Sequence, residues 1–153
     1  MHQPGFFDLG CRYDSLDAKP DPLVAINRRI PWECFRDRLR AALEQVGQRK
    51  TAGERKPAAG RKPPGEILMF KVLVLQSLYN LGDDAVEYQV RDRLSFMRFP
   101  GLGLEDGVPD GKTVWLYREA LATPGAIEEL FADFGKHLKD KFYLANRCCP
   151  NGP

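Results

Sequence analysis

The sequence predicts a small all-α domain. Apolar residues recur at spacings of three and four in several segments, which is typical of helices with one buried face. No segment shows the alternation of apolar and polar residues that marks a half-buried strand. At 153 residues the chain can bury one modest core. We therefore expect one helical domain over residues 21–145, between an arm at residues 1–20 and a tail at residues 146–153.

The first predicted helix begins at Pro31, because proline suits the first position of a helix. Residues 1–20 have aromatic side chains but little periodicity, and we expect them to pack as an extended arm over the domain. From Pro31 onward one apolar stripe recurs at helical spacing. Its members are Trp32, Phe35, Leu39, Ala42, Leu43 and Val46.

Residues 47–65 are predicted to form a flexible basic loop. This segment lacks large apolar side chains, so burial cannot offset the entropy of ordering it. It has six basic residues and one acid, a local charge of +5, whereas the rest of the chain has 17 basic and 20 acidic residues. The basic residues are Arg49, Lys50, Arg55, Lys56, Arg61 and Lys62.

The segment Glu66 to Leu81 is apolar around nearly its whole circumference, which predicts the central helix of the domain. Gly82 follows, and Asp83 or Asp84 is expected to cap the next helix, with Glu87 as the acid of a capping box. The buried edge of that helix is predicted to consist of Val86, Val90 and Leu94.

Two further helices follow a Gly-rich loop at residues 101–111. Asp110 is expected to cap the first, and the two closely spaced helices before and after the Gly-rich loop are compatible with a helix-turn-helix variant. Its inward residues are Val114, Tyr117 and Leu121, and those nearer solvent are Lys112, Trp115, Arg118 and Glu119. The second helix begins at Pro124 and is expected to bury Ile127, Leu130, Phe131, Phe134 and Leu138.

Several functional classes lack support in the sequence. The four cysteines have no metal-ligand spacing, and residues 67–81 are too short and too often interrupted by polar residues to span a bilayer. Paired acids at helix starts are more typical of capping than of catalysis, and neither His2 nor His137 has a nucleophilic partner in the pattern. We therefore assign no catalytic residue, metal or cofactor to this chain, and expect a cytoplasmic, nucleoid-associated protein without a membrane partner.

The strongest candidate for function is a DNA-binding surface. Loop cations neutralise phosphates with release of counterions, and a cationic helix can contact a groove or its backbone. The candidate residues are Arg61, Lys62, Arg91, Arg93, Arg98, Lys112, Thr113, Trp115 and Arg118. Two ordinary explanations stay open: the loop is a solvated linker with Trp115 in the core, and the arginines pair with Glu87, Asp92 or Glu105.

Five segments in order give the chain a resemblance to a known family. They are Phe6-Phe7-Asp8-Leu9, the Trp32 helix, Gly60-Arg61-Lys62-Pro63, the run from Leu68 to Phe99, and residues 101–121 with Val108-Pro109-Asp110 and Thr113-Val114-Trp115. Together they resemble the amino-terminal domain of transposases of the IS-five insertion-sequence family. The resemblance covers nearly everything up to Ala145 and departs from the family at Pro100, Gly107 and Gly111.

The resemblance implies a function for the domain. In this family the helical domain binds the terminal inverted repeats of the element, and a ribonuclease-H-like domain cuts and joins DNA with two divalent metals held by an Asp-Asp-Glu triad. Residues 146–153 depart from the family pattern, so we expect a transposase truncated before its catalytic domain, with a full-length transposase or a second copy as a further partner. The alternatives are the first reading frame of a frameshift-fused active transposase, and a non-functional remnant or protein-interaction module.

Overall fold

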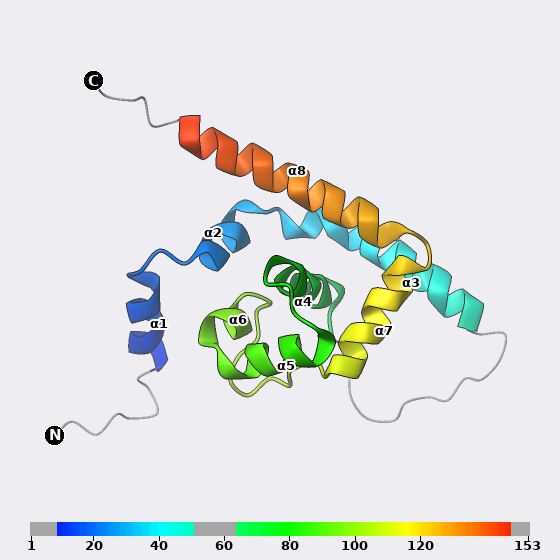
Figure 1. The fold of residues 1–153 in the computed structure, drawn as a ribbon, viewed down its shortest axis with the longest axis horizontal. Coiled ribbons are helices and arrows are strands. Elements are labelled where there is room, and N and C mark those ends of the chain that lie inside the picture. Colours follow the sequence, from blue (N-terminus) through cyan, green and yellow to red (C-terminus); the bar gives the residue numbers. More distant parts are fainter. Residues whose placement is uncertain (1–8, 51–63, 148–153) are drawn as a thin grey trace.

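A computed structural model describes residues 9–50 and 64–147, and folds them into helices without a β-strand (Figure 1). This confirms the predicted all-α class. The α-helices are α1 (Leu9–Asp17), α2 (Pro22–Arg29), α3 (Arg36–Lys50), α4 (Glu66–Leu78), α5 (Asp83–Asp92), α6 (Leu94–Arg98), α7 (Gly111–Ala122) and α8 (Ala126–Arg147). A 3₁₀ helix, η1, covers Trp32–Phe35.

Two short helices precede η1. The extended arm predicted for residues 1–20 is corrected where the structure describes it, because Leu9–Asp17 is helical. Helix α2 was not predicted, although its start has ordinary signals: Asp21 accepts a hydrogen bond from the Leu23 amide at 2.9 Å, and Pro22 follows the cap. Its length explains why periodicity missed it, since eight residues make barely two turns.

The helix predicted from Pro31 exists with a different start and end. It begins with the tighter turns of η1 and continues as α3 to Lys50. The predicted loop is therefore corrected at residues 47–50, which are the last residues of α3; after Gly47, Gln48, Arg49 and Lys50 have high helix propensity. The remainder of the predicted loop up to residue 63 lies outside the described residues.

Helix α4 is the centre of the fold, as predicted, and lies between the other helices in Figure 1. Seven of its thirteen residues are buried, which matches its apolar circumference. It ends at Leu78 rather than Leu81, because Asn80 takes a left-handed backbone conformation with φ of 51°. The Leu81 amide then donates to the Gln76 carbonyl and closes the turn.

Residues 83–98 form two helices where one was predicted. Val86 and Val90 are buried on α5, but Arg93 is extended and Leu94 starts α6. The capping prediction is also wrong: Gly82 occupies the cap position without a side-chain bond, and both aspartates lie in the first turn. Acids in that turn are still favoured by the helix dipole.

The last two helices are close to their predicted places. Asp110 caps α7, accepting a hydrogen bond from the Thr113 amide at 2.7 Å, as predicted. Helix α8 starts at Ala126, two residues later than expected, because Gly125 has a φ of 71°. It runs to Arg147, so Asn146 and Arg147 are helical where a tail was expected, and residues 148–153 lie outside the described residues.

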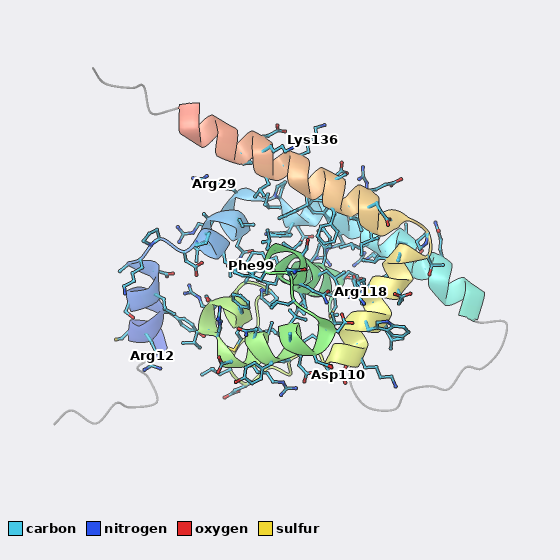
Figure 2. All side chains as sticks on the ribbon, viewed as in Figure 1. Arg12, Arg29, Phe99, Asp110, Arg118 and Lys136 are labelled. Atoms are coloured by element: carbon cyan, nitrogen blue, oxygen red, sulfur yellow. The ribbon has the colours of Figure 1, made fainter. Side chains whose placement is uncertain are left out.

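An aromatic cluster joins η1, α4, α8 and the turn after α6. The Trp32 ring lies 6.2 Å from Phe70, 5.6 Å from Phe99 and 5.8 Å from Phe134 between centroids. Its indole Nε1 donates to the Asn27 carbonyl at 3.2 Å, so its polar atom is satisfied as well. Figure 2 shows Phe99 in the interior of the fold, where this cluster gathers. The cluster therefore links η1 near the start of the described residues to α8 near their end.

Candidate nucleic-acid interface

The start of α7 is fixed closely against α5. A Cβ at Gly111 would lie 2.4 Å from the Asp84 carboxylate and 3.2 Å from the Asp84 backbone nitrogen. The Gly111 amide donates to Glu87 Oε2 at 2.7 Å. Glu87 therefore does not close a capping box on α5 but binds the first turn of α7, and glycine permits this close approach.

The outward face of α7 is partly apolar. Trp115 is 45% exposed and Leu116 is 41% exposed, and Lys112 and Glu119 are exposed beside them. Spacings of three and four put these four residues on one stripe. The alternative that Trp115 completes the core is therefore wrong. Val114 and Leu121 are fully buried on the opposite face, as predicted.

Tyr117 lies between the two faces of α7 and faces α4. Its hydroxyl donates to the Glu66 carbonyl at 3.0 Å, and burial raises the pKa of this phenol well above its usual value. The Glu66 carboxylate pairs with Arg36 at 3.3 Å and Arg40 at 3.2 Å. These contacts tie α7 and α3 to the start of α4, so the outward stripe is held in a defined position.

Arg118 was predicted to lie near solvent, but it is half-buried and engaged. Its guanidinium donates two hydrogen bonds to the Asp83 carboxylate, at 2.8 and 3.1 Å. Asp83 also accepts from Gln76 Nε2 at 2.7 Å. In Figure 2 Arg118 lies on α7, at a distance from Asp110 at the start of that helix. The bidentate pair joins α7 to α5, and Arg118 would have to give it up to read a base edge.

The three arginines near α5 and α6 have different surroundings. Arg91 pairs with Glu87 at 3.0 Å, which is one of the ordinary ion pairs considered from the sequence. Arg93 is exposed, with its guanidinium 5.2 Å from the centroid of Phe96. Arg98 pairs with Asp17 at 3.1 Å and lies over the Tyr13 ring. Of the three, Arg91 lines a groove together with Thr113 of α7, whereas Arg98 lines a separate hollow beside α2.

Two grooves meet beside Thr113. One, of about 690 Å³, includes Arg91, Asp106, Asp110 and Pro64 in its lining. The other, of about 730 Å³, is mainly apolar and includes Leu43, Leu116 and Tyr117. Pro64 and Thr113 line both. Arg61 and Lys62, which were predicted to contact phosphates, lie outside the described residues.

The match to known families decides what this domain is. Residues 11–120 match the model of a family described as Transposase domain (DUF772). The chain belongs to this transposase-domain family. No curated protein and no solved structure matches the chain. The matched residues run from α1 almost to the end of α7, so the family pattern includes both the core helix and the outward stripe of α7.

The transposase domain shows no metal centre in its described part. No group of three or more His, Cys, Asp or Glu side chains there could hold a metal ion. Cys34 Sγ and His137 Nε2 lie 3.8 Å apart, but desolvation and the nearby Asp133 carboxylate raise the pKa of the Cys34 thiol. This opposes a thiolate nucleophile. Within the described ranges, no helix has the length and apolar character that crossing a membrane requires.

Two surface features of the transposase domain were missed from the sequence. Leu116 is exposed, although it was not among the residues expected near solvent. Arg28 and Arg29 occupy the last turn of α2 and are exposed. A paired Arg before Pro31 was a usable signal, because cations are favoured at helix ends and proline often follows one.

Lys71 on α4 is half-buried under two aromatic rings. Its ammonium donates to Asn27 Oδ1 at 2.8 Å and lies 5.0 Å from the Trp32 centroid. Desolvation lowers the pKa of Lys71 below its ordinary value of 10.5. The unfolded chain therefore binds more protons than the folded chain in the window just below 10.5, and this group makes stability rise with pH there.

That sign gives a pH prediction for Lys71→Met, which keeps most of the length of the side chain but removes the charge. The free energy of unfolding of the wild type, minus that of the variant, should increase between about pH 7 and about pH 10. Urea titrations of both proteins at each pH measure it, and all other titrating groups cancel in the difference. A difference that is constant or falls with pH would contradict the assignment.

Proposed function

We propose that this chain is the DNA-binding portion of an insertion-sequence transposase and binds the terminal inverted repeats of its element. Membership of the transposase-domain family supports a role in transposition. The resemblance to the IS-five family supports the inverted repeats as the target. In this proposal the cutting and joining of DNA, and the divalent metals they need, belong to a ribonuclease-H-like domain, and the partner of this chain is duplex DNA on the bacterial chromosome.

The observation that carries the proposal is the outward stripe of α7, in which a cation and two large apolar side chains face solvent. Lys112 can contact a phosphate, and Trp115 and Leu116 can contact apolar base edges such as the thymine methyl group. The rest of α7 is fixed by the Asp110 cap and by the Arg118–Asp83 pair. A helix held this firmly presents its outward residues at little additional entropic cost.

We expect two α7 variants to affect different properties of DNA binding, one the sequence discrimination and the other the affinity for any duplex. Trp115→Ala should reduce the discrimination between inverted-repeat and shuffled duplex by about 5- to 150-fold, which corresponds to about 1–3 kcal/mol for each base pair that is no longer recognised. Lys112→Gln should weaken binding to both duplexes alike and lower the salt slope by about 0.9. Fluorescence anisotropy with duplexes from the sequences that flank the gene measures both effects.

Tyr88→Ala is the matched control, because Tyr88 is an aromatic residue that is 63% exposed on α5, outside the α7 stripe. It should leave both affinity and discrimination unchanged. If Trp115→Ala and Tyr88→Ala behave alike, α7 does not read the repeats. If the wild type binds neither duplex at low salt, the DNA-binding assignment fails.

A further inference from the structure

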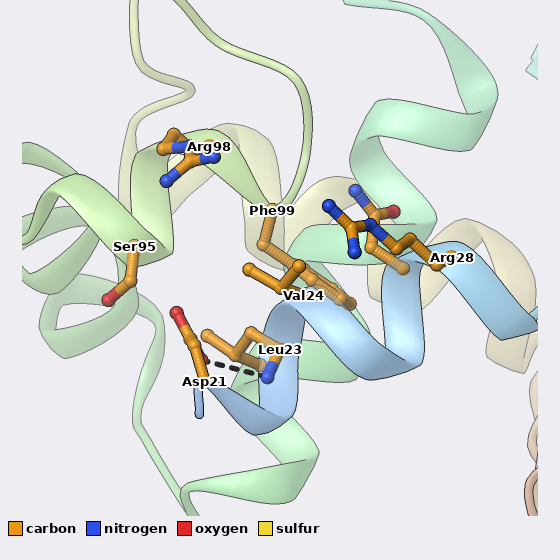
Figure 3. A pocket seen from close by; sticks show the side chains of 8 residues that line it. Asp21, Leu23, Val24, Arg28, Ser95, Arg98 and Phe99 are labelled. Atoms are coloured by element: carbon orange, nitrogen blue, oxygen red, sulfur yellow. Dashed lines mark hydrogen bonds between the residues drawn. The ribbon is translucent and has the colours of Figure 1, made fainter. Parts of the chain in front are cut away.

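A small hollow of about 180 Å³ lies between α2 and α6, on the other side of α4 from α7 in the view of Figure 1 (Figure 3). Small-molecule sites usually measure about 300–1,000 Å³, so this one suits a single polar group rather than a whole ligand. Its lining brings together polar residues that are far apart in the sequence: Asp21, Asn27, Arg28, Ser95 and Arg98.

Two of these residues have unused donors. The side chains of Arg28 and Ser95 make no hydrogen bond or ion pair with any residue that the structure describes. Arg28 is exposed on the last turn of α2, and Ser95 lies in the first turn of α6. In Figure 3 Arg28 extends from α2 and Ser95 from α6 at the edges of the same hollow.

The Asn27 amide also presents its donor end. Its Oδ1 accepts a hydrogen bond from the Lys71 ammonium at 2.8 Å. An ammonium has only donors, so the oxygen has to face Lys71, which leaves the two N–H groups of Nδ2 free to point elsewhere. Lys71 itself places a positive charge behind the wall that Asn27 and Phe99 form.

Arg98 is only partly used by its neighbours. One nitrogen, Nη2, donates to the two oxygens of Asp17 at 3.1 and 3.3 Å. A guanidinium has five N–H donors, and no other hydrogen bond of Arg98 occurs within residues 9–50 and 64–147. Arg98 is among the residues that line the hollow.

The one carboxylate among the lining residues, that of Asp21, already caps helix α2. Asp21 Oδ1 accepts the Leu23 amide as the cap of α2, which Figure 3 shows as a dashed line. The lining therefore has two guanidiniums, an amide and a hydroxyl with unused donors against one partly used acceptor. Such a donor excess matches an oxyanion, whose oxygens only accept.

We propose that this pocket binds one phosphate of the DNA backbone, with Arg28, Ser95 and Arg98 donating to its oxygens. The inference rests on the proposed function for the identity of the anion, and it adds a backbone contact on a face that α7 does not reach. Phosphate contacts of this kind fix the position of a protein on the duplex without reading sequence. The pocket should therefore affect affinity for all duplexes equally.

The test uses variants with opposite expected signs. Arg28→Gln should lower the salt slope of DNA binding by about 0.9, with no change in discrimination. Asp21→Asn should strengthen binding about fivefold at low salt, because a unit charge about 4 Å away in water has roughly this effect. Asparagine is as good a helix cap as aspartate, so α2 stays intact.

The controls are exposed residues of α8, Lys136→Gln and Asp140→Asn, which change the net charge by the same amounts without touching the pocket. If each pocket variant behaves like its α8 control, the proposal is overturned while the α7 assignment stands.

Inorganic phosphate, titrated into ¹⁵N-labelled protein, provides a readout that does not need DNA. The amides of residues 27, 28, 95 and 98 should shift in the wild type and not in Ser95→Asp, whose added carboxylate repels the anion. Absence of these shifts overturns the pocket. Shifts without an effect of Arg28→Gln on the DNA salt slope overturn the DNA assignment and point to a free phosphate compound. If phosphate shifts these amides in the wild type but the protein binds no DNA, the proposed function fails while the phosphate-binding pocket stands.

Discussion

Trp32→Ala should destabilise the protein by about 3–5 kcal/mol, the usual cost of removing a large buried aromatic side chain. Only 8% of Trp32 is exposed, and its ring contacts Phe70, Phe99 and Phe134, which come from three different parts of the fold. The variant also leaves the Asn27 carbonyl without its donor and Lys71 without one of its rings. Urea unfolding followed by circular dichroism measures the loss.

The second tryptophan provides a matched control. Trp115→Ala removes the same side chain from a position that is 45% exposed on α7, and should change stability by no more than about 0.5 kcal/mol. Equal losses in the two variants would mean that Trp115 is a core residue and that the interpretation of the α7 stripe is wrong. A small loss for Trp32→Ala would mean that the aromatic cluster contributes little to holding η1, α4 and α8 together.

Neutralising the six cations of residues 47–65 should remove most of the salt dependence of DNA binding and leave the smaller part due to Lys112 and Arg28. Each phosphate contact contributes about 0.9 to the slope of log affinity against log salt, so six contacts account for about 5. The variant replaces Arg49, Lys50, Arg55, Lys56, Arg61 and Lys62 by Gln. Inverted-repeat and random duplex should lose affinity alike, because these contacts carry no sequence information.

A comparison of equal charge removes the effect of net charge alone. Replacing Lys136, Lys139 and Lys141 on the exposed side of α8 by Gln should change the slope little, whereas replacing Arg55, Lys56 and Arg61 should lower it by about 2.7. If the six-cation variant keeps the full slope, the segment is a solvated linker, and the interaction of this chain with DNA rests on the described helices.

Features that depend on neighbours in the chain were predictable from the sequence. The all-α class, the central helix α4 and the Asp110 cap follow from periodicity and from capping chemistry, which involve residues within one or two turns. The buried face of α7 follows for the same reason, because Val114 and Leu121 repeat at helical spacing. The two helices that were not predicted, α1 and α2, also have a local explanation, because they are too short for a periodic signal.

The chemistry of the surface was decided by tertiary structure. The sequence predicted Arg118 near solvent, but its guanidinium donates hydrogen bonds to Asp83, which is 35 residues away. Arg98 likewise pairs with Asp17, which is 81 residues away. Periodicity cannot see such partners, because it reports which side of a helix is apolar and not which charge lies opposite. The pocket between α2 and α6 also depends on tertiary structure, because its donors come together only when α2 lies beside α6. The sequence around each helix does not indicate that contact.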